Sequence, residues 1–188
     1  MKNIVIFASG TGTNAKTIID YFENSQTAQV TLVVSNKGTA PVLLKAALSG
    51  VPAMILDKRE YFDTKEFVAF LQKQKTDLIV LAGFLLLVPK MLLEAFPDKI
   101  INVHPALLPA YGGKGMYGMR VCEEILKNKE KESGITFHYV NENFDEGKII
   151  FQQKCMVDVD DTPESLSQKN HALEHKYYPQ IIEQLLKK

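Results

Sequence analysis

Short apolar runs alternate with segments of helical spacing through the first hundred residues, and this alternation constrains the fold more than any other feature. The runs are mostly rich in Val and Ile and bounded by turn residues, which is typical of buried strands. They are Ile4–Ala8, Val30–Val34, Ala53–Leu56, Leu78–Ala82 and Ile100–Val103. The segments with helical spacing are Ala15–Phe22, Pro41–Leu48, Lys65–Lys73 and Lys90–Phe96. Because the connections are long enough for crossover helices, we expect an α/β, Rossmann-like fold with a mostly parallel twisted sheet and helices on both faces.

The pattern changes after a further helical segment, Met119–Asn128. Gly134–Val140 and Lys148–Val157 are strand-like and are joined by a turn-rich segment, which predicts a β-hairpin-like extension. Thr162 followed by Pro163 is typical of a helix N-cap with proline at the first helical position. Apolar residues at helical spacing continue to the end, so a long C-terminal helix is expected.

Length and charge favour one soluble domain with small-molecule partners. The chain has 188 residues, and its 22 basic and 22 acidic side chains cancel. It therefore lacks the strong positive field that would favour nucleic acid or an anionic membrane. No apolar stretch approaches the roughly 18 residues that a membrane helix needs. We expect a cytoplasmic protein, either a monomer or a homodimer.

The two cysteines, Cys122 and Cys155, fit no spacing of metal ligands, and no metal is expected. They are too few for a disulfide framework and suit a reducing compartment, although a single bridge between them is the alternative.

The first predicted strand is followed by a turn, residues 9–14, with two glycines, three hydroxyl groups and an amide. The backbone N–H groups and the dipole of the next helix suit a phosphate there. Gly10 and Gly12 fit only a relaxed dinucleotide fingerprint, and the second strand ends in Ser35 and Asn36 rather than in an acidic residue that would hold a ribose. A lone phosphomonoester is therefore favoured over a dinucleotide. The alternative is a tight turn closed by a Ser or Thr cap.

The end of the fifth predicted strand carries Asn102 and His104. Side chains two apart on a strand share a face, so an amide donor lies beside an imidazole where open α/β sheets bind their ligands. A carbonyl attacked by an amine needs a donor for its developing oxyanion, and the nitrogen must lose a proton. Asn102 and His104 are suited to these two tasks. The alternative is a polar pair that satisfies the strand end.

Asp145 lies in the turn between the two hairpin strands, directly before Glu146 and Gly147. A carboxylate near His104 would orient the imidazole and stabilise its charged form. Considered alone, an Asp in such a turn is more often part of the turn itself.

Several motifs together resemble the folate-dependent formyltransferases. They are Asn102–Pro109, Gly134–Val140 and Phe144–Gly147, supported by the 9–14 turn, Leu81–Phe84 and the segment from Glu174 to Pro179. The resemblance covers essentially the whole chain and is greatest to the members that formylate glycinamide ribonucleotide in purine synthesis. It implies 10-formyltetrahydrofolate as the formyl donor and the primary amine of that ribonucleotide as the acceptor.

The resemblance also implies roles for individual residues. Asn102 and His104 would hold the oxyanion, while Asp145 would support the imidazole and a proton-shuttling water. Gly12, Thr13 and Asn14 would bind the substrate phosphate, and Glu174 would lie beside the ribose, with a helix-surface charge as its alternative. The expected folate-binding residues are Leu85, Leu86, Leu87, Val88, Asn141, Glu142, Asn143 and Phe144, with His138 in a supporting role.

The expected organisation is one formyltransferase domain, 1–188, in which residues 1–100 bind the ribonucleotide phosphate and residues 101–188 carry catalysis and folate binding. Two positions depart from the family pattern, because Leu86 replaces an arginine and Ala110 a frequent lysine. Lys114 is a candidate to compensate for the second, and the alternative is that the glycine-rich loop is mobile until substrate orders it. Two other functions remain open. One is a formyltetrahydrofolate hydrolase, in which water replaces the amine, and the other is a non-catalytic nucleotide-binding module.

Overall fold

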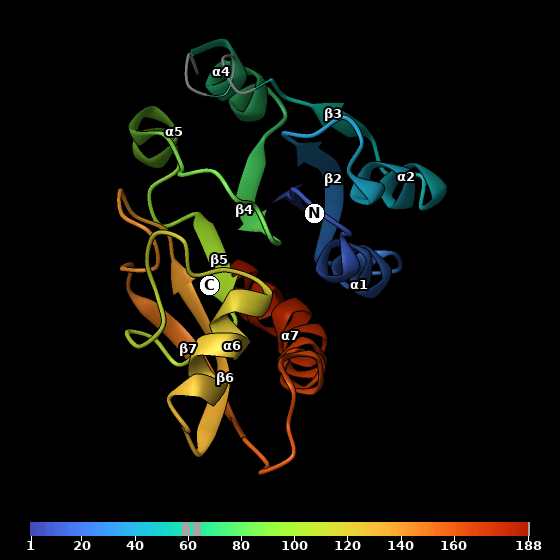
Figure 1. Cartoon of the computed structure of the whole chain (residues 1–188). Helices are drawn as coiled ribbons and strands as arrows, with labels where there is room; N and C mark the ends of the chain where they lie inside the picture. Colours follow the sequence, from blue (N-terminus) through green and yellow to red (C-terminus); the bar gives the residue numbers. More distant parts are fainter. Residues whose placement is uncertain (58–60, 62–64, 188) are drawn as a thin grey trace.

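A seven-stranded sheet forms the centre of the computed structural model, which describes residues 1–57, 61 and 65–187 (Figure 1). The strand order is β3-β2-β1-β4-β5-β6-β7. β1 to β5 pair in parallel, whereas β6 is antiparallel to β5 and β7 to β6. The strands are β1 Lys2–Phe7, β2 Ala28–Ser35, β3 Ala53–Ile55, β4 Thr76–Leu81, β5 Ile100–His104, β6 Glu132–Tyr139 and β7 Ile149–Met156. The predicted Rossmann-like sheet is confirmed, and the predicted hairpin is continuous with it through β5.

Helices cover both faces of this sheet. One apolar core lies on each face of the sheet, and alternate residues of β1 belong to different cores. Ile4 and Ile6 pack against α1, α2 and α7, whereas Val5 and Phe7 pack against α4 and α5. A smaller core joins α6 to the first turns of α7. The helices are α1 Thr13–Phe22, α2 Pro41–Leu48, α4 Lys65–Lys73, α5 Lys90–Ala95, α6 Met119–Lys127 and α7 Pro163–Leu186. The predicted strands and helices thus agree with the structure to within about two residues at each end.

The predicted cap of the C-terminal helix is confirmed as a reciprocal capping box. Oγ1 of Thr162 accepts a hydrogen bond from the Ser165 N–H at 3.2 Å, and the Thr162 N–H donates to Oγ of Ser165 at 2.9 Å. Two N–H groups that the helix leaves without backbone partners are thereby satisfied. None of the helices in the described part of the chain is both long and apolar enough to cross a membrane.

The order in which strands are added to the sheet reverses between β1 and β4, because β2 lies on one side of β1 and β4 on the other. Ligands bind at such switch points, outside the carboxyl ends of the strands. Ser9 ties three loops together at this edge. Its Oγ donates to Oδ1 of Asn36 at 2.6 Å and accepts from the Leu85 N–H at 3.1 Å. The ends of β1, β2 and β4 therefore form one braced rim.

Candidate active site

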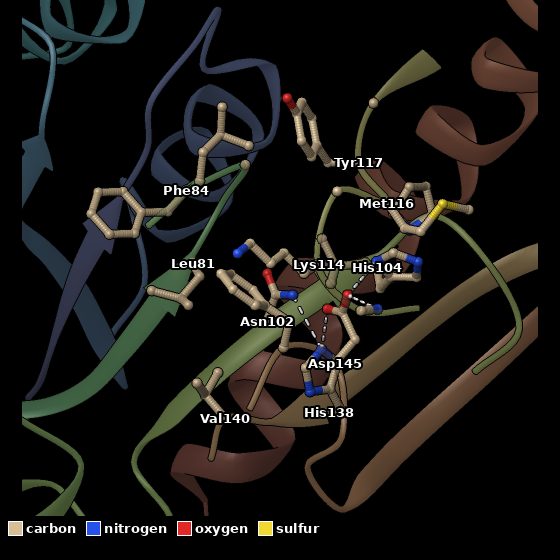
Figure 2. A pocket seen from close by; sticks show the side chains of 18 of the residues that line it. Leu81, Phe84, Asn102, His104, Lys114, Met116, Tyr117, His138, Val140 and Asp145 are labelled. Atoms are coloured by element: carbon tan, nitrogen blue, oxygen red, sulfur yellow. Dashed lines mark hydrogen bonds and ion pairs between the residues drawn. The ribbon is translucent and has the colours of Figure 1, made fainter. Parts of the chain in front are cut away.

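A cavity of about 640 Å3 opens at this rim, beside the carboxyl ends of β4 and β5 (Figure 2). Most of its wall residues come from five parts of the chain. They are residues 83–88 after β4, 102–105 at the end of β5, the 113–118 loop, 143–145 between β6 and β7, and one face of α7 with Asn170, His171 and Glu174. Segments far apart in sequence thus converge on one site.

Asn102 and His104 lie on the cavity side of β5. The antiparallel register sets Asn102 opposite His138 and His104 opposite Thr136 on β6. Directly opposed residues share a face of the sheet, so their side chains meet. Nδ2 of Asn102 is 3.1 Å from Nε2 of His138, and Nδ1 of His138 is 2.9 Å from the Tyr139 carbonyl oxygen. Since a carbonyl can only accept, Nδ1 of His138 carries the proton and Nε2 accepts from the Asn102 amide.

His104 is 3% exposed, and both of its ring nitrogens have neighbours. Nε2 lies 2.7 Å from the Tyr111 carbonyl oxygen and donates its proton there. Nδ1 lies 3.4 Å from Oδ2 of Asp145. Burial lowers the pKa of His104, and this effect outweighs the opposing influence of the Asp145 carboxylate and the Tyr111 carbonyl. Burial therefore favours the neutral ring, whereas the carboxylate beside Nδ1 favours a second proton there.

Asp145 is the third residue of the predicted trio. Oδ1 is 3.6 Å from Nε2 of His138, and Oδ2 accepts from the Gly113 N–H at 3.0 Å. Burial acts to raise the pKa of this carboxyl, but the interactions with His138, His104 and the Gly113 N–H together lower it. The backbone of Asp145 is left-handed, with φ 59°, a conformation that Asp tolerates better than most residues. The structure brings the predicted trio together and sets His138 in contact with two of its members.

The loop that reaches Asp145 depends on a glycine that the sequence did not single out. A Cβ added at Gly112 would lie 2.6 Å from Cδ2 of Leu108 and 3.2 Å from Cβ of Asp145. A side chain here would therefore force the Leu108 side chain and Asp145 to move. Thr136 supports the same stretch, since its Oγ1 donates to the Ala106 carbonyl at 2.6 Å and accepts from the Leu108 N–H at 3.0 Å.

The predicted phosphate turn ends in Gly12, the N-cap of α1, whose φ is 73°. A Cβ there would lie 2.4 Å from Cγ2 of Val42, so the position is closed to other residues by conformation and by space. No side chain caps α1, and the alternative of a Ser or Thr cap is therefore wrong. Asn14 lines the cavity, whereas Gly12 and Thr13 are not among its lining residues.

Asn14 connects this turn to α7. Its Nδ2 donates to Oε2 of Glu174 at 2.7 Å, and Nδ1 of His171 lies 3.0 Å from the same oxygen. Glu174 is 3% exposed, so the alternative of a helix-surface charge is wrong. The hydrogen bond to Glu174 raises the pKa of His171. Buried Oδ1 of Asn14 accepts no hydrogen bond from the described residues, which leaves an acceptor available to a ligand in this wall.

The opposite wall contains most of the residues predicted to bind folate. Those that line the cavity are Leu85, Leu86, Leu87, Val88, Asn143 and Phe144. Asn141 and Glu142 are not among the lining residues. Oδ1 of Asn141 accepts from the Asn143 N–H at 3.0 Å, and Glu142 lies 3.9 Å from Nζ of Lys90.

Sequence reasoning missed Met116, Tyr117 and Val140, which Figure 2 shows around the same opening. Met116 and Tyr117 belong to an irregular loop whose position local periodicity does not encode. In the described part of the chain, no three His, Cys, Asp or Glu side chains are grouped to hold a metal ion.

Comparison with known proteins identifies the family. The formyl transferase pattern matches residues 2–182. The chain is 37% identical over 191 residues to phosphoribosylglycinamide formyltransferase of Bacillus subtilis, covering 99% of this chain and 95% of that protein. It is 39% identical over 187 residues to the chloroplastic phosphoribosylglycinamide formyltransferase of Arabidopsis thaliana, with 96% of this chain covered. The chain spans 64% of the length of the Arabidopsis protein.

Structural comparison leads to the same family. The crystal structure of glycinamide ribonucleotide transformylase 1 from Symbiobacterium toebii superposes with a TM-score of 0.90 at 34% identity, covering 100% of this chain and 88% of that one. An enzyme family thus accounts for the whole fold, which argues against the alternative of a non-catalytic nucleotide-binding module. The chain belongs to the formyl transferase family, among the phosphoribosylglycinamide formyltransferases.

Proposed function

We propose that the protein transfers the formyl group of 10-formyltetrahydrofolate to the primary amine of glycinamide ribonucleotide, giving formylglycinamide ribonucleotide and tetrahydrofolate for purine synthesis. One observation carries the proposal. Asn102, His104 and Asp145 meet in a single cavity whose walls differ in chemistry. One wall is mostly apolar, with Leu85 to Val88, and the other is polar, with Asn14 and Glu174. The names of the full-length relatives support the same reaction.

In this reaction the amine nitrogen bonds to the formyl carbon, and the electrons of the C=O bond move to oxygen. Asn102 is suited to stabilise that oxygen, since only one of its two amide N–H groups is engaged by His138. The formyl oxygen would replace the Tyr111 carbonyl at Nε2 of His104, because both are carbonyl acceptors. The oxyanion then collapses, and the bond from carbon to N10 of the folate breaks.

Asp145 would handle the proton. Its lowered pKa keeps it ionised, so it can accept the amine proton through a water and return it to the departing N10. Its Oδ2 lies 3.4 Å from Nδ1 of His104, so the carboxylate would also stabilise a second proton on that ring. His138 would orient Asn102 through Nε2, which is a more direct part than the supporting role expected from sequence.

The two walls suit the two substrates. Gly12, Thr13 and Asn14 would hold the phosphate at the amino-terminal end of α1, and Glu174 would accept hydroxyl groups of the ribose. Leu85 to Val88, with 141–144 opposite, would enclose the pterin. Our proposed division gives the phosphate turn to residues 1–100 and the catalytic trio to residues 101–188, with the cavity built by both. We also propose a cytoplasmic monomer or homodimer, consistent with two free cysteines.

A direct assay tests the proposal. The protein is mixed with 10-formyltetrahydrofolate, with and without glycinamide ribonucleotide, and loss of the formyl folate is followed together with formation of the formylated ribonucleotide. We expect turnover that depends on the ribonucleotide. Loss of formyl folate without the ribonucleotide would instead identify a hydrolase, and no loss in either reaction would remove the transferase proposal.

A further inference from the structure

Lys114, in the loop after β5, has an unusual position for a lysine. It is the one Lys or Arg among the described residues that line the cavity, where the ionisable carboxyl groups are Asp145 and Glu174. It forms no ion pair with any residue in the described part of the chain. Figure 2 shows its side chain extending from the loop into the cavity. A cation with no protein partner is therefore available to a bound ligand.

The 113–118 loop is held to Asp145 at the residue before this lysine. The preceding residue, Gly113, donates its N–H to Oδ2 of Asp145 at 3.0 Å. The Lys114 backbone therefore begins directly beside the carboxylate proposed to move protons. A lysine side chain is long and flexible, so we expect its ammonium group to reach the space in front of Asn102 and His104 by rotation of the side chain.

The proposed reaction needs positive charge at this point. Formyl transfer passes through an intermediate with negative charge on the formyl oxygen. Asn102 offers that oxygen a neutral amide, and any charge on the His104 ring is offset by the Asp145 carboxylate, 3.4 Å from Nδ1. Asp145, close by, carries a negative charge that disfavours an oxyanion. The trio therefore supplies hydrogen bonds but no net positive charge.

We propose that Lys114 is a further catalytic residue, whose ammonium group contacts the formyl oxygen and stabilises the charge that develops there. This inference rests on the proposed formyl transfer. The ammonium keeps its three protons throughout the step. Charge builds on oxygen as the amine bonds to carbon, and it disappears when the C=O bond re-forms and the bond to N10 of the folate breaks.

Lys114→Gln and Lys114→Arg test this role. Lys114 is exposed, so neither change is expected to disturb folding. Lys73→Gln is the matched control, because Lys73 is an exposed lysine at the end of α4, close to the amino-terminal edge of β4 and away from the cavity. The measurements are kcat, KM for each substrate, and the single-turnover rate with both substrates saturating.

We expect Lys114→Gln to lower kcat and the single-turnover rate by about tenfold to a hundredfold, with either KM changed by less than about threefold. Lys114→Arg keeps the charge and should recover most of the lost rate, while Lys73→Gln should match the wild type. An unchanged kcat in Lys114→Gln would overturn the proposal. So would a loss confined to KM, which would mean that the lysine binds the substrate phosphate or a folate carboxylate. If the wild-type protein shows no ribonucleotide-dependent turnover, the proposed function itself fails, and Lys114 loses its role with it.

Discussion

Asn102 and His138 face each other across β5 and β6, with Nδ2 of the amide 3.1 Å from Nε2 of the ring. The Tyr139 carbonyl fixes the proton of His138 on Nδ1, so Nε2 is an acceptor and sets the orientation of the amide. This links a ring that contacts Asp145 to the group proposed to stabilise the oxyanion.

The link predicts strong coupling between these two residues. Asn102→Ala and His138→Ala should each lower kcat by about tenfold or more, whereas the double variant should be little worse than the more damaged single variant. The measurement is a double-mutant cycle on kcat/KM. Effects that multiply in the double variant would mean that His138 does not act through Asn102. Asn102→Ala paired with Lys73→Gln is the control for independent sites.

Asp145→Asn should lower turnover far more than it weakens substrate binding. The amide keeps the shape of the side chain but cannot take up the amine proton, and general acid–base groups typically contribute about a hundredfold or more. The check compares kcat with the dissociation constant of each substrate, measured by calorimetry. A variant with near-normal kcat would remove the proton-transfer role from Asp145.

Gly112→Ala should separate the loop from Asp145. The added methyl group would lie 2.6 Å from Cδ2 of Leu108 and 3.2 Å from Cβ of Asp145, so the Leu108 side chain must move and Asp145 must be displaced slightly, which would weaken the hydrogen bond from Gly113. We expect kcat to fall about tenfold, with overpacking costing about 1–3 kcal/mol of stability at most. Gly38→Ala is the control, since its added methyl group would lie at an ordinary 3.5 Å from Cδ1 of Ile55, its nearest neighbour in the described part of the chain. Equal turnover in the two variants would contradict a requirement for close approach.

Thr13→Asp should raise KM for the ribonucleotide by about tenfold or more, because it sets a negative charge beside the proposed phosphate position. The same charge is favourable at the amino-terminal end of α1, so stability should not fall. Thr13→Asn is the neutral control. A rise in KM for the folate instead would show that the two substrate walls have been assigned the wrong way round.

The stability of the protein should depend on His104 in mildly acidic solution. Burial lowers its pKa from the ordinary value of 6.5, so below about pH 6.5 the unfolded chain binds a proton that the native state does not. The free energy of unfolding therefore decreases as the pH falls below that value. His104→Asn removes the group, and its loss of stability between about pH 7.5 and 5.5, measured by urea unfolding, should be smaller than that of the wild type. His175, whose pKa is also lowered, is present in both proteins and cancels in the comparison. Identical pH dependence would show that His104 does not contribute.

Local sequence patterns were enough to predict the fold class and one pair of site residues. Buried strands and amphipathic helices have different periods, and their alternation is a local property that can be read directly from the chain. The two-residue repeat of a strand likewise set Asn102 and His104 on one face. The glycines of the 9–14 turn indicated a tight turn between β1 and α1, because a left-handed φ favours glycine.

The distant residues that complete the site come together only in the folded chain. Nothing local says that β6 pairs antiparallel with β5, yet this pairing brings His138 to Asn102 and carries the Asp145 turn to His104. Only the resemblance joined Asp145 to the pair before the fold was known. Glu174 could be interpreted as a surface charge until the packing of α7 on α1 buried it against Asn14. Long-range register and burial arise from the assembled core, and for that reason they are absent from any short stretch of sequence.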